Sequence, residues 1–260
     1  MACFLWELWY IKSRKTKKKK DGDMLLFLIR HGDPVYSPDS LTPKGKLQAQ
    51  ALAKRFAVHG LDKIFASPMI RAQETARPTS EMLSIPIQIE DWASEDYTWK
   101  EFTVKYNGDF VHWLFFRQNT EFLQNGDELL GNGNWQDGKS VQELDVKACY
   151  KRLEAASDAF LERLGYKREG YGLYKILRPS EERVALFCHQ GVTLLLVPYL
   201  LGIPPHLFWS SFDVNHTGVS VFEFRNNPNG ITSPKCISFS DCSHLLNEGL
   251  PYQFLNEIDL

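Results

Sequence analysis

The sequence predicts an α/β protein in which helices cover a central β-sheet, and three observations lead to this prediction. Short apolar runs that suit buried strands alternate along the chain with longer amphipathic segments that suit helices. Apolar residues make up 43% of the chain and charged residues 24%, which is ordinary for a globular protein and excludes a largely disordered chain. With 260 residues, the chain is long enough to bury a sizeable core in one large domain or two small ones.

The first predicted strand is Leu25–Ile29, a continuous apolar run of the kind that is buried on both faces of a sheet. It ends at Arg30-His31-Gly32, and a loop with two prolines follows. Thr42 then has the properties of an N-cap, and Pro43 those of the first residue of a helix. We expect this helix to run to about Val58.

A second strand and helix are predicted next. Lys63–Ala66 suits a short strand, and Ser67-Pro68 suits the cap and first turn of a helix that carries Arg71. We expect Pro78 to break or kink this helix, because proline removes a backbone donor. Ile85–Ile89 alternates apolar and polar residues, as is typical of a strand.

Residues 92–137 differ from the rest of the chain because aromatic side chains crowd them. We interpret this segment as an insertion that forms a lid over the main domain. After it, Ser140 and Glu143 make a capping box that opens a helix. The predicted apolar face of that helix comprises Val141, Leu144, Ala148, Leu153, Ala156, Phe160 and Leu164.

The remaining predicted elements continue the alternation of strands and helices. Strands are expected at Leu173–Leu177, Val184–Cys188, Gly218–Phe224 and Cys236–Phe239, and a helix at Gly191–Leu201.

The first 23 residues differ from the body of the chain in charge, with a net charge of +4 against −6 for the remainder. Their apolar stretch precedes their basic run, which is the reverse of a secretory signal. They suit either a membrane-surface anchor or a leader or extension outside the fold. We favour the second interpretation, which makes residues 24–260 the working domain.

Composition also limits the partners and the compartment. A body as acidic as residues 24–260 is a poor nucleic-acid binder, because phosphate backbones need a basic face. No apolar run reaches the roughly 18 residues of a membrane span, so we expect no stable membrane insertion. Five cysteines without zinc-site spacing favour a reduced, cytoplasmic compartment. The oligomeric state stays open.

Charged and nucleophilic residues follow the predicted strands at three places. Arg30 and His31 end the first strand, Arg71 lies in the helix after the second, and His189 directly follows the strand Val184–Cys188. In open α/β sheets, ligands bind in the crevice beyond the carboxyl ends of the strands. Neutral imidazole is a nucleophile, and guanidinium groups match phosphate oxygens through paired hydrogen bonds. These residue types together indicate a phosphate site.

The segments LFLIRHGDP, SPMIRAQETA and FCHQGVT resemble the three signature segments of the histidine phosphatase superfamily, in its phosphoglycerate mutase-like branch. They fall in the family's order, and the resemblance covers most of Met24–Leu246. It implies a three-layer α/β/α sandwich with a mixed, mostly parallel sheet and a lid insertion. It also implies a metal-independent hydrolase that needs no cofactor and acts on a small phosphorylated substrate.

The resemblance further implies a role for each signature residue. His31 would be the catalytic nucleophile and would become a phosphohistidine. Arg30, Arg71 and His189 would bind the phosphoryl oxygens, and His189 would also belong to the catalytic set.

The family's proton donor is usually a glutamate after the third strand, and Glu95 suits this position best. Asp96 and Glu101 stay open as alternatives. The remaining histidines have no assigned role; they are His59, His112, His206, His216 and His244.

Two other functions stay open beside a phosphatase. Mutases of this family usually continue R-H-G-E-S, whereas Asp33-Pro34-Val35-Tyr36 follows here, which favours hydrolysis over a phosphoglycerate mutase-type transfer. A non-catalytic phosphate-binding module would not need a nucleophile, so the two histidines argue against it.

A metal-dependent phosphoesterase would need clustered Asp and His ligands, and we expect no metal. The sequence does not indicate the substrate.

Overall fold

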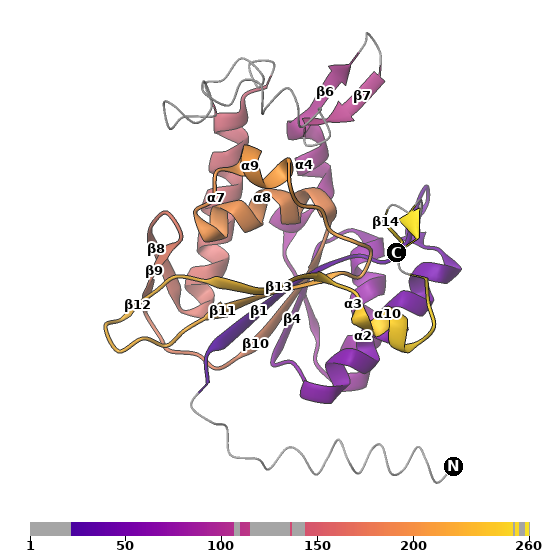
Figure 1. The fold of residues 1–260 in the computed structure, drawn as a ribbon, viewed down its shortest axis with the longest axis horizontal. Coiled ribbons are helices and arrows are strands. Elements are labelled where there is room, and N and C mark those ends of the chain that lie inside the picture. The colour runs from indigo at the N-terminus through magenta and orange to yellow at the C-terminus, as the bar shows by residue number, and fades with distance from the viewer. Residues whose placement is uncertain are drawn as a thin grey trace.

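The computed structural model of the chain describes residues 22–106, 110–114, 136, 144–251, 253–254 and 258–259 (Figure 1). Within them, the main sheet has the strand order β13-β11-β1-β10-β4-β5. Its strands are β1 (Met24–Arg30), β4 (Lys63–Ala66), β5 (Ile87–Ile89), β10 (Arg183–Cys188), β11 (Val219–Phe224) and β13 (Lys235–Asp241). The strands β1, β4, β5 and β10 run parallel, whereas β11 pairs antiparallel with β1, and β13 pairs antiparallel with β11. The predicted mixed, mostly parallel sheet is therefore confirmed.

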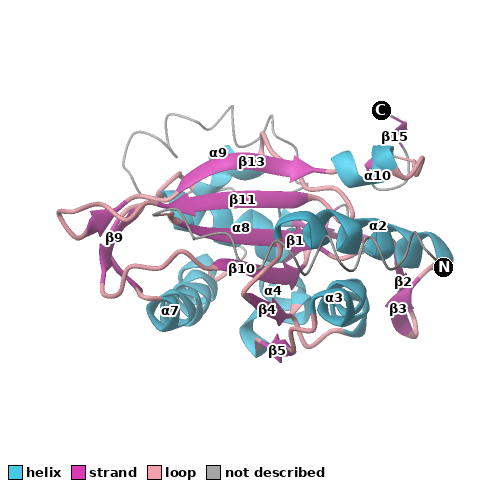
Figure 2. Cartoon of the chain, turned by 90° about the horizontal axis from the view of Figure 1, so that it is seen from below, coloured by secondary structure: helices cyan, strands magenta, loops and turns pink. Residues whose placement is uncertain are grey.

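Helices cover both faces of the sheet, which confirms the predicted three layers (Figures 1 and 2). One layer contains α2 (Pro43–His59), α3 (Ile70–Leu83) and α10 (Ser243–Asn247). The other contains α4 (Glu95–Phe102), α7 (Val146–Leu164), α8 (Gln190–Leu201) and α9 (Pro205–Trp209), and the 3-10 turn η2 spans Asp91–Ala93.

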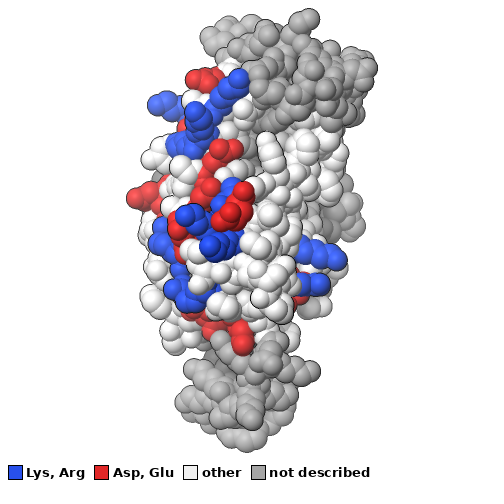
Figure 3. Space-filling model, turned by 90° about the vertical axis from the view of Figure 1, so that its left-hand side faces the viewer, with Lys and Arg blue, Asp and Glu red and all other residues white. Residues whose placement is uncertain are grey.

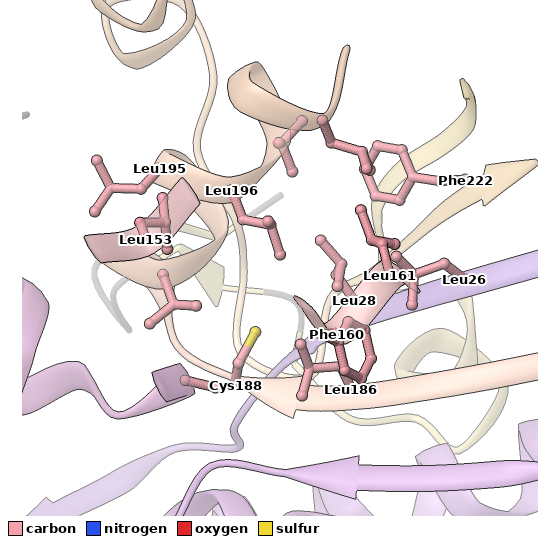
Figure 4. Close-up of a cluster of buried hydrophobic side chains, with 14 of the residues drawn as sticks. Leu26, Leu28, Leu153, Phe160, Leu161, Leu186, Cys188, Leu195, Leu196 and Phe222 are labelled. Atoms are coloured by element: carbon pink, nitrogen blue, oxygen red, sulfur yellow. The ribbon is translucent and has the colours of Figure 1, made fainter. Parts of the chain in front are cut away.

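Side chains of β1 alternate between two hydrophobic clusters, one under each helix layer. Leu26 and Leu28 pack with Phe160 of α7 and with α8, as Figure 4 shows. Phe27 and Ile29 point the other way, into the cluster that α2 and α3 cover. The strand is therefore buried on both faces, as its continuous apolar run predicts.

Smaller antiparallel sheets surround the main one. They pair β2 (Pro34–Tyr36) with β3 (Asp39–Leu41), β6 (Thr103–Tyr106) with β7 (Phe110–Trp113), β9 (Leu173–Ile176) with β8 (Tyr166–Gly170) and β12 (Ile231–Thr232), and β14 (Gln253–Phe254) with β15 (Ile258–Asp259). The expected loop after His31 is thus a short hairpin.

The start of α3 differs from the prediction. The helix begins at Ile70 after Met69, and Ser67 does not cap it. The Ser67 hydroxyl instead lies 2.7 Å from His189 Nε2, because β4 and β10 end side by side. Pro78 lies inside a helix that continues to Leu83, so the predicted break is wrong.

The start of α7 also differs from the prediction. Asp145 is the N-cap, and its Oδ1 accepts a hydrogen bond of 3.1 Å from Ala148 N. Ser140 and Glu143 lie outside the described residues, as does most of the predicted lid. The buried face of α7 comprises Val146, Tyr150, Leu153, Ser157, Phe160, Leu161 and Leu164, so the two alanines of the predicted face do not belong to it.

The N-terminal edge of the described chain contacts the domain. Asn226 N donates to Asp23 Oδ1 at 2.6 Å, and Asn226 Nδ2 donates to the carbonyl of Gly22 at 2.8 Å. Gly22 and Asp23 are the last two residues of the segment predicted to lie outside the fold, and both are hydrogen-bonded to it.

On the face shown in Figure 3, acidic and basic side chains are interspersed. Arg168 of β8 and Asp158 of α7 form an ion pair at 2.9 Å. None of the helices within the described ranges is both long and apolar enough to cross a membrane.

Candidate active site

The candidate site lies where β1 and β10 end at the same edge of the sheet. Arg30 and Cys188 are register partners in the parallel pair, so the next residues, His31 and His189, emerge beside each other. Their ring centroids are 5.1 Å apart. Both side chains are buried, at 3% and 0% exposure. The register of the two strands thus brings both signature histidines to one site, as we expected from the sequence.

His31 is held in one tautomer. Its Nδ1 lies 2.7 Å from the carbonyl oxygen of Gly32, which only accepts, so Nδ1 carries the proton and donates it. In the neutral ring, Nε2 therefore keeps its lone pair. Burial lowers the pKa of His31 well below its usual range, and the nearby His189 and Arg30 lower it further. The ring is neutral near pH 7 and is able to act as a nucleophile.

His189 is positioned through its other nitrogen. Nε2 pairs with the Ser67 hydroxyl, whereas Nδ1 lies 3.9 Å from Glu95 Oε2. Burial lowers the pKa of His189 well below its usual range, and the charges of Arg71 and Arg30 act in the same direction. This ring is therefore neutral as well, and Nδ1 faces the centre of the cluster.

Two buried guanidinium groups supply the positive charge. Arg30 Nη1 donates to the carbonyl of Val214 at 2.7 Å, and Arg71 Nη1 donates to Asp39 Oδ1 at 2.8 Å. Both side chains are at most 5% exposed. Each guanidinium is anchored by one nitrogen, and its planar fork matches the oxygens of a phosphoryl group.

Glu95 is the carboxyl that the structure brings to this cluster. It is the first residue of α4 and is 9% exposed. Its Oε1 accepts a hydrogen bond of 3.0 Å from Gly191 N, at the start of α8. Burial raises the pKa of Glu95 to about 7, against the opposing effects of the Gly191 N–H and the two arginines. A protonated carboxyl is thus available near neutral pH.

The two alternative carboxyls lie elsewhere. Asp96 is exposed on the outer side of α4. Glu101 forms an ion pair with Arg152, in which Oε1 accepts from Nε at 2.5 Å and Oε2 from Nη2 at 2.7 Å. Of the three candidates that the sequence left open, only Glu95 contacts the cluster.

The sequence reasoning missed His216. Its ring centroid lies 5.8 Å from that of His31, and its Nδ1 lies 3.7 Å from Asp33 Oδ1. The Asp33 carboxylate also accepts a hydrogen bond of 2.6 Å from the Thr42 hydroxyl. His216 precedes β11, and the antiparallel pairing of β11 with β1 brings this end of the strand to the site. The sequence did not indicate this pairing, and without it nothing in the sequence connects His216 to the site.

His244 lies outside the cluster. Its Nε2 pairs with the Thr217 hydroxyl at 3.0 Å, and Nδ1 lies 3.4 Å from Arg55 Nη1. His31 and Asp33 have an H-x-D spacing, but no group of three or more His, Cys, Asp or Glu within the described part of the chain is placed to hold a metal ion.

Comparisons with known proteins decide the family. The sequence profile of the histidine phosphatase superfamily (branch 1) matches residues 26–129. Phosphoserine phosphatase 1 of Hydrogenobacter thermophilus is 31% identical over 222 residues, which cover 79% of this chain and 89% of that protein. The chain belongs to the histidine phosphatase superfamily.

Other relatives agree with this assignment. The adenosylcobalamin/alpha-ribazole phosphatase of Escherichia coli K12 is 28% identical to this histidine phosphatase over 199 residues, covering 72% of this chain and 83% of that protein. A crystallised phosphoserine phosphatase of Entamoeba histolytica has the same fold, with a TM-score of 0.55 at 18% identity, covering 85% of this chain and 99% of that one. The predicted family and enzyme class are confirmed.

Proposed function

We propose that this histidine phosphatase hydrolyses a phosphomonoester of a small molecule through a phosphohistidine on His31. The observation that supports this most strongly is the tautomer of His31, whose Nδ1 is committed to the Gly32 carbonyl. The nucleophilic Nε2 belongs to a ring that lies among Arg30, Arg71 and a second neutral imidazole.

In the first step, His31 Nε2 attacks phosphorus in line and a nitrogen–phosphorus bond forms. The bond from phosphorus to the leaving oxygen breaks, and Glu95 gives its proton to that oxygen. Arg30, Arg71 and His189 bind the three equatorial oxygens. Most of the rate comes from positioning and charge neutralisation, as in phosphoryl transfer generally.

In the second step, the Glu95 carboxylate takes a proton from water, and the water oxygen attacks phosphorus. The nitrogen–phosphorus bond breaks with its electron pair returning to His31. Inorganic phosphate leaves, and both residues return to their starting protonation states. Because side chains supply the cations, the proposed reaction uses no metal and no cofactor.

The substrate class is a small phosphorylated molecule. The relatives are named adenosylcobalamin/alpha-ribazole phosphatase and phosphoserine phosphatase 1. The acidic body and the mixed charges in Figure 3 support a small substrate in preference to nucleic acid. The cysteines that the structure describes are unpaired thiols, which supports the proposed cytoplasmic location.

A phosphoglycerate mutase-type transfer is the second candidate, because a probable phosphoglycerate mutase of Yersinia enterocolitica is 24% identical over 207 residues. A screen of O-phosphoserine, alpha-ribazole phosphate and 3-phosphoglycerate separates the two functions. A phosphatase releases inorganic phosphate, in the presence of EDTA as well, and His31→Ala releases none. Isomerisation of 3-phosphoglycerate without phosphate release would favour the mutase.

A further inference from the structure

Trp113, the last residue of β7, lies directly on the first turn of α8. A Cβ added to Gly191 would lie 2.0 Å from Trp113 Cζ3 and 2.3 Å from Cη2, so the indole occupies the space that any larger residue would need. The methyl carbon of Thr98 lies 2.8 Å from the same point. Trp113 and Thr98 therefore close over one side of Gly191.

Gly191 is also the residue whose backbone N–H holds the carboxyl of Glu95. Glu95 and Thr98 lie three residues apart on α4, so both face α8 from the same side of their helix. The indole of Trp113 also packs edge-on against Trp99, with ring centroids 5.2 Å apart, and Trp99 is 45% exposed. The indole thus contacts both the exposed Trp99 and Gly191, the residue whose N–H binds Glu95.

We propose that Trp113 is a positioning residue for the proton donor, covering the Glu95–Gly191 hydrogen bond and keeping water from the carboxyl. The inference rests on the proposed role of Glu95 as acid. It adds a role for Trp113 at the end of β7, which would help to keep Glu95 in the protonated form that the first step needs.

The charges around Glu95 explain why water exclusion matters. The groups that face it are Arg30 at the end of β1, Arg71 of α3, the neutral His189 and the thiol of Cys188 at the end of β10, and the N–H groups of Gly191 and Val192 of α8. The arginines and N–H groups favour the carboxylate, and only burial favours the acid. Admitting water would weaken burial and leave the opposing effects in place, so the pKa of Glu95 would fall.

The test is the pH profile of kcat/KM for an alkyl phosphate, which reports the ionisation of the free enzyme. In Trp113→Ala, we expect the alkaline limb to move to lower pH by about one unit or more. Trp113→Phe, which keeps a ring over Gly191, should move it less. Thr98→Ser, which removes only the methyl group, should give a smaller shift in the same direction. The ionisation of the substrate is common to all variants.

Trp209→Phe is the matched control, because Trp209 is a core tryptophan whose Nε1 donates to the Leu194 carbonyl, away from Glu95. It should lower the melting temperature without moving the limb. The inference is overturned if Trp113→Ala and Thr98→Ser keep the wild-type limb while turnover still depends on His31. If His31→Ala turns over normally, the proposed function fails instead.

Discussion

At the scale of single residues, burial is the largest cause of the shifted pKa values of the site. It lowers the pKa of both His31 and His189, so both rings are neutral near pH 7, and it raises the pKa of Glu95 to about 7, so a share of this carboxyl stays protonated there beside two arginines. An uncharged nucleophile, an uncharged acid and fixed cations suit the attack on a phosphate dianion. The activity should therefore require His31 unprotonated and Glu95 protonated.

Glu95→Gln tests the acid role. We expect it to slow hydrolysis of an alkyl phosphate by about 10²- to 10⁴-fold, because the leaving alkoxide needs a proton. The first step with p-nitrophenyl phosphate should slow much less, since nitrophenolate leaves without one. Asp96→Asn on the same helix is the matched control and should have neither effect. A defect in the control that depends on the leaving group would transfer the acid role to Asp96.

The same substitution predicts a change in stability with pH. Because the pKa of Glu95 is raised from 4.5 to about 7 in the folded state, folding favours the protonated form. This stabilisation is complete below pH 4.5 and is lost as the pH rises through 7. Glu95→Gln stays neutral, so its unfolding free energy relative to wild type should rise by up to about 3 kcal/mol from pH 4.5 to pH 8. Denaturant melts at both pH values measure this, and a constant difference would contradict it.

At the scale of elements, local signals predicted some boundaries and tertiary contacts overrode others. As predicted, α2 begins at Pro43 after the N-cap Thr42, and β4 spans Lys63–Ala66. These predictions hold because an N-cap and an apolar run act within the segment itself. Ser67 has the composition of a cap, yet its hydroxyl pairs with His189 on a neighbouring strand. His216 was missed for a related reason, since strand pairing and not sequence spacing brings it to the site.

Thr42 connects the helix α2 to the site, and this gives a prediction. Its hydroxyl oxygen accepts from Gly45 N at 3.0 Å and donates to the Asp33 carboxylate. Thr42→Ala should cost about 1 kcal/mol of stability from the lost cap. Thr42→Ser, which keeps the hydroxyl, should cost much less in a chemical-denaturation measurement. Equal losses in both variants would show that the methyl group, not the cap, is responsible.

At the scale of the whole molecule, the site lies where both helix layers meet one edge of the sheet. Arg71 comes from α3 in one layer, and Glu95 and the N–H of Gly191 come from α4 and α8 in the other. The position of the signature residues beyond the ends of predicted strands indicated this convergence, because ligands of open α/β sheets bind beyond the carboxyl ends of the strands. The aromatic segment 92–137 contains no motif that predicts which residues it contacts. The position of Trp113 over Gly191 therefore became known only from the structure.

The whole molecule also suggests where the working domain begins. Because Gly22 and Asp23 bond to Asn226, we expect a chain that starts at Gly22 to keep the melting temperature and turnover of the full chain. A chain that starts at Met24 should melt slightly lower, since Asn226 loses two partners. Aggregation or loss of most activity in the longer of these two chains would show that residues 1–21 belong to the working domain.

The central claim is that His31 carries the phosphoryl group, and trapping that intermediate tests it most directly. Glu95→Gln is mixed with p-nitrophenyl phosphate, quenched in alkali within milliseconds, and mapped by peptide mass spectrometry. The account predicts one phosphoryl group on His31 that is stable in alkali and lost in acid, and none in the double variant with His31→Ala. A phosphoryl group on a different residue, or normal turnover by His31→Ala alone, would contradict it.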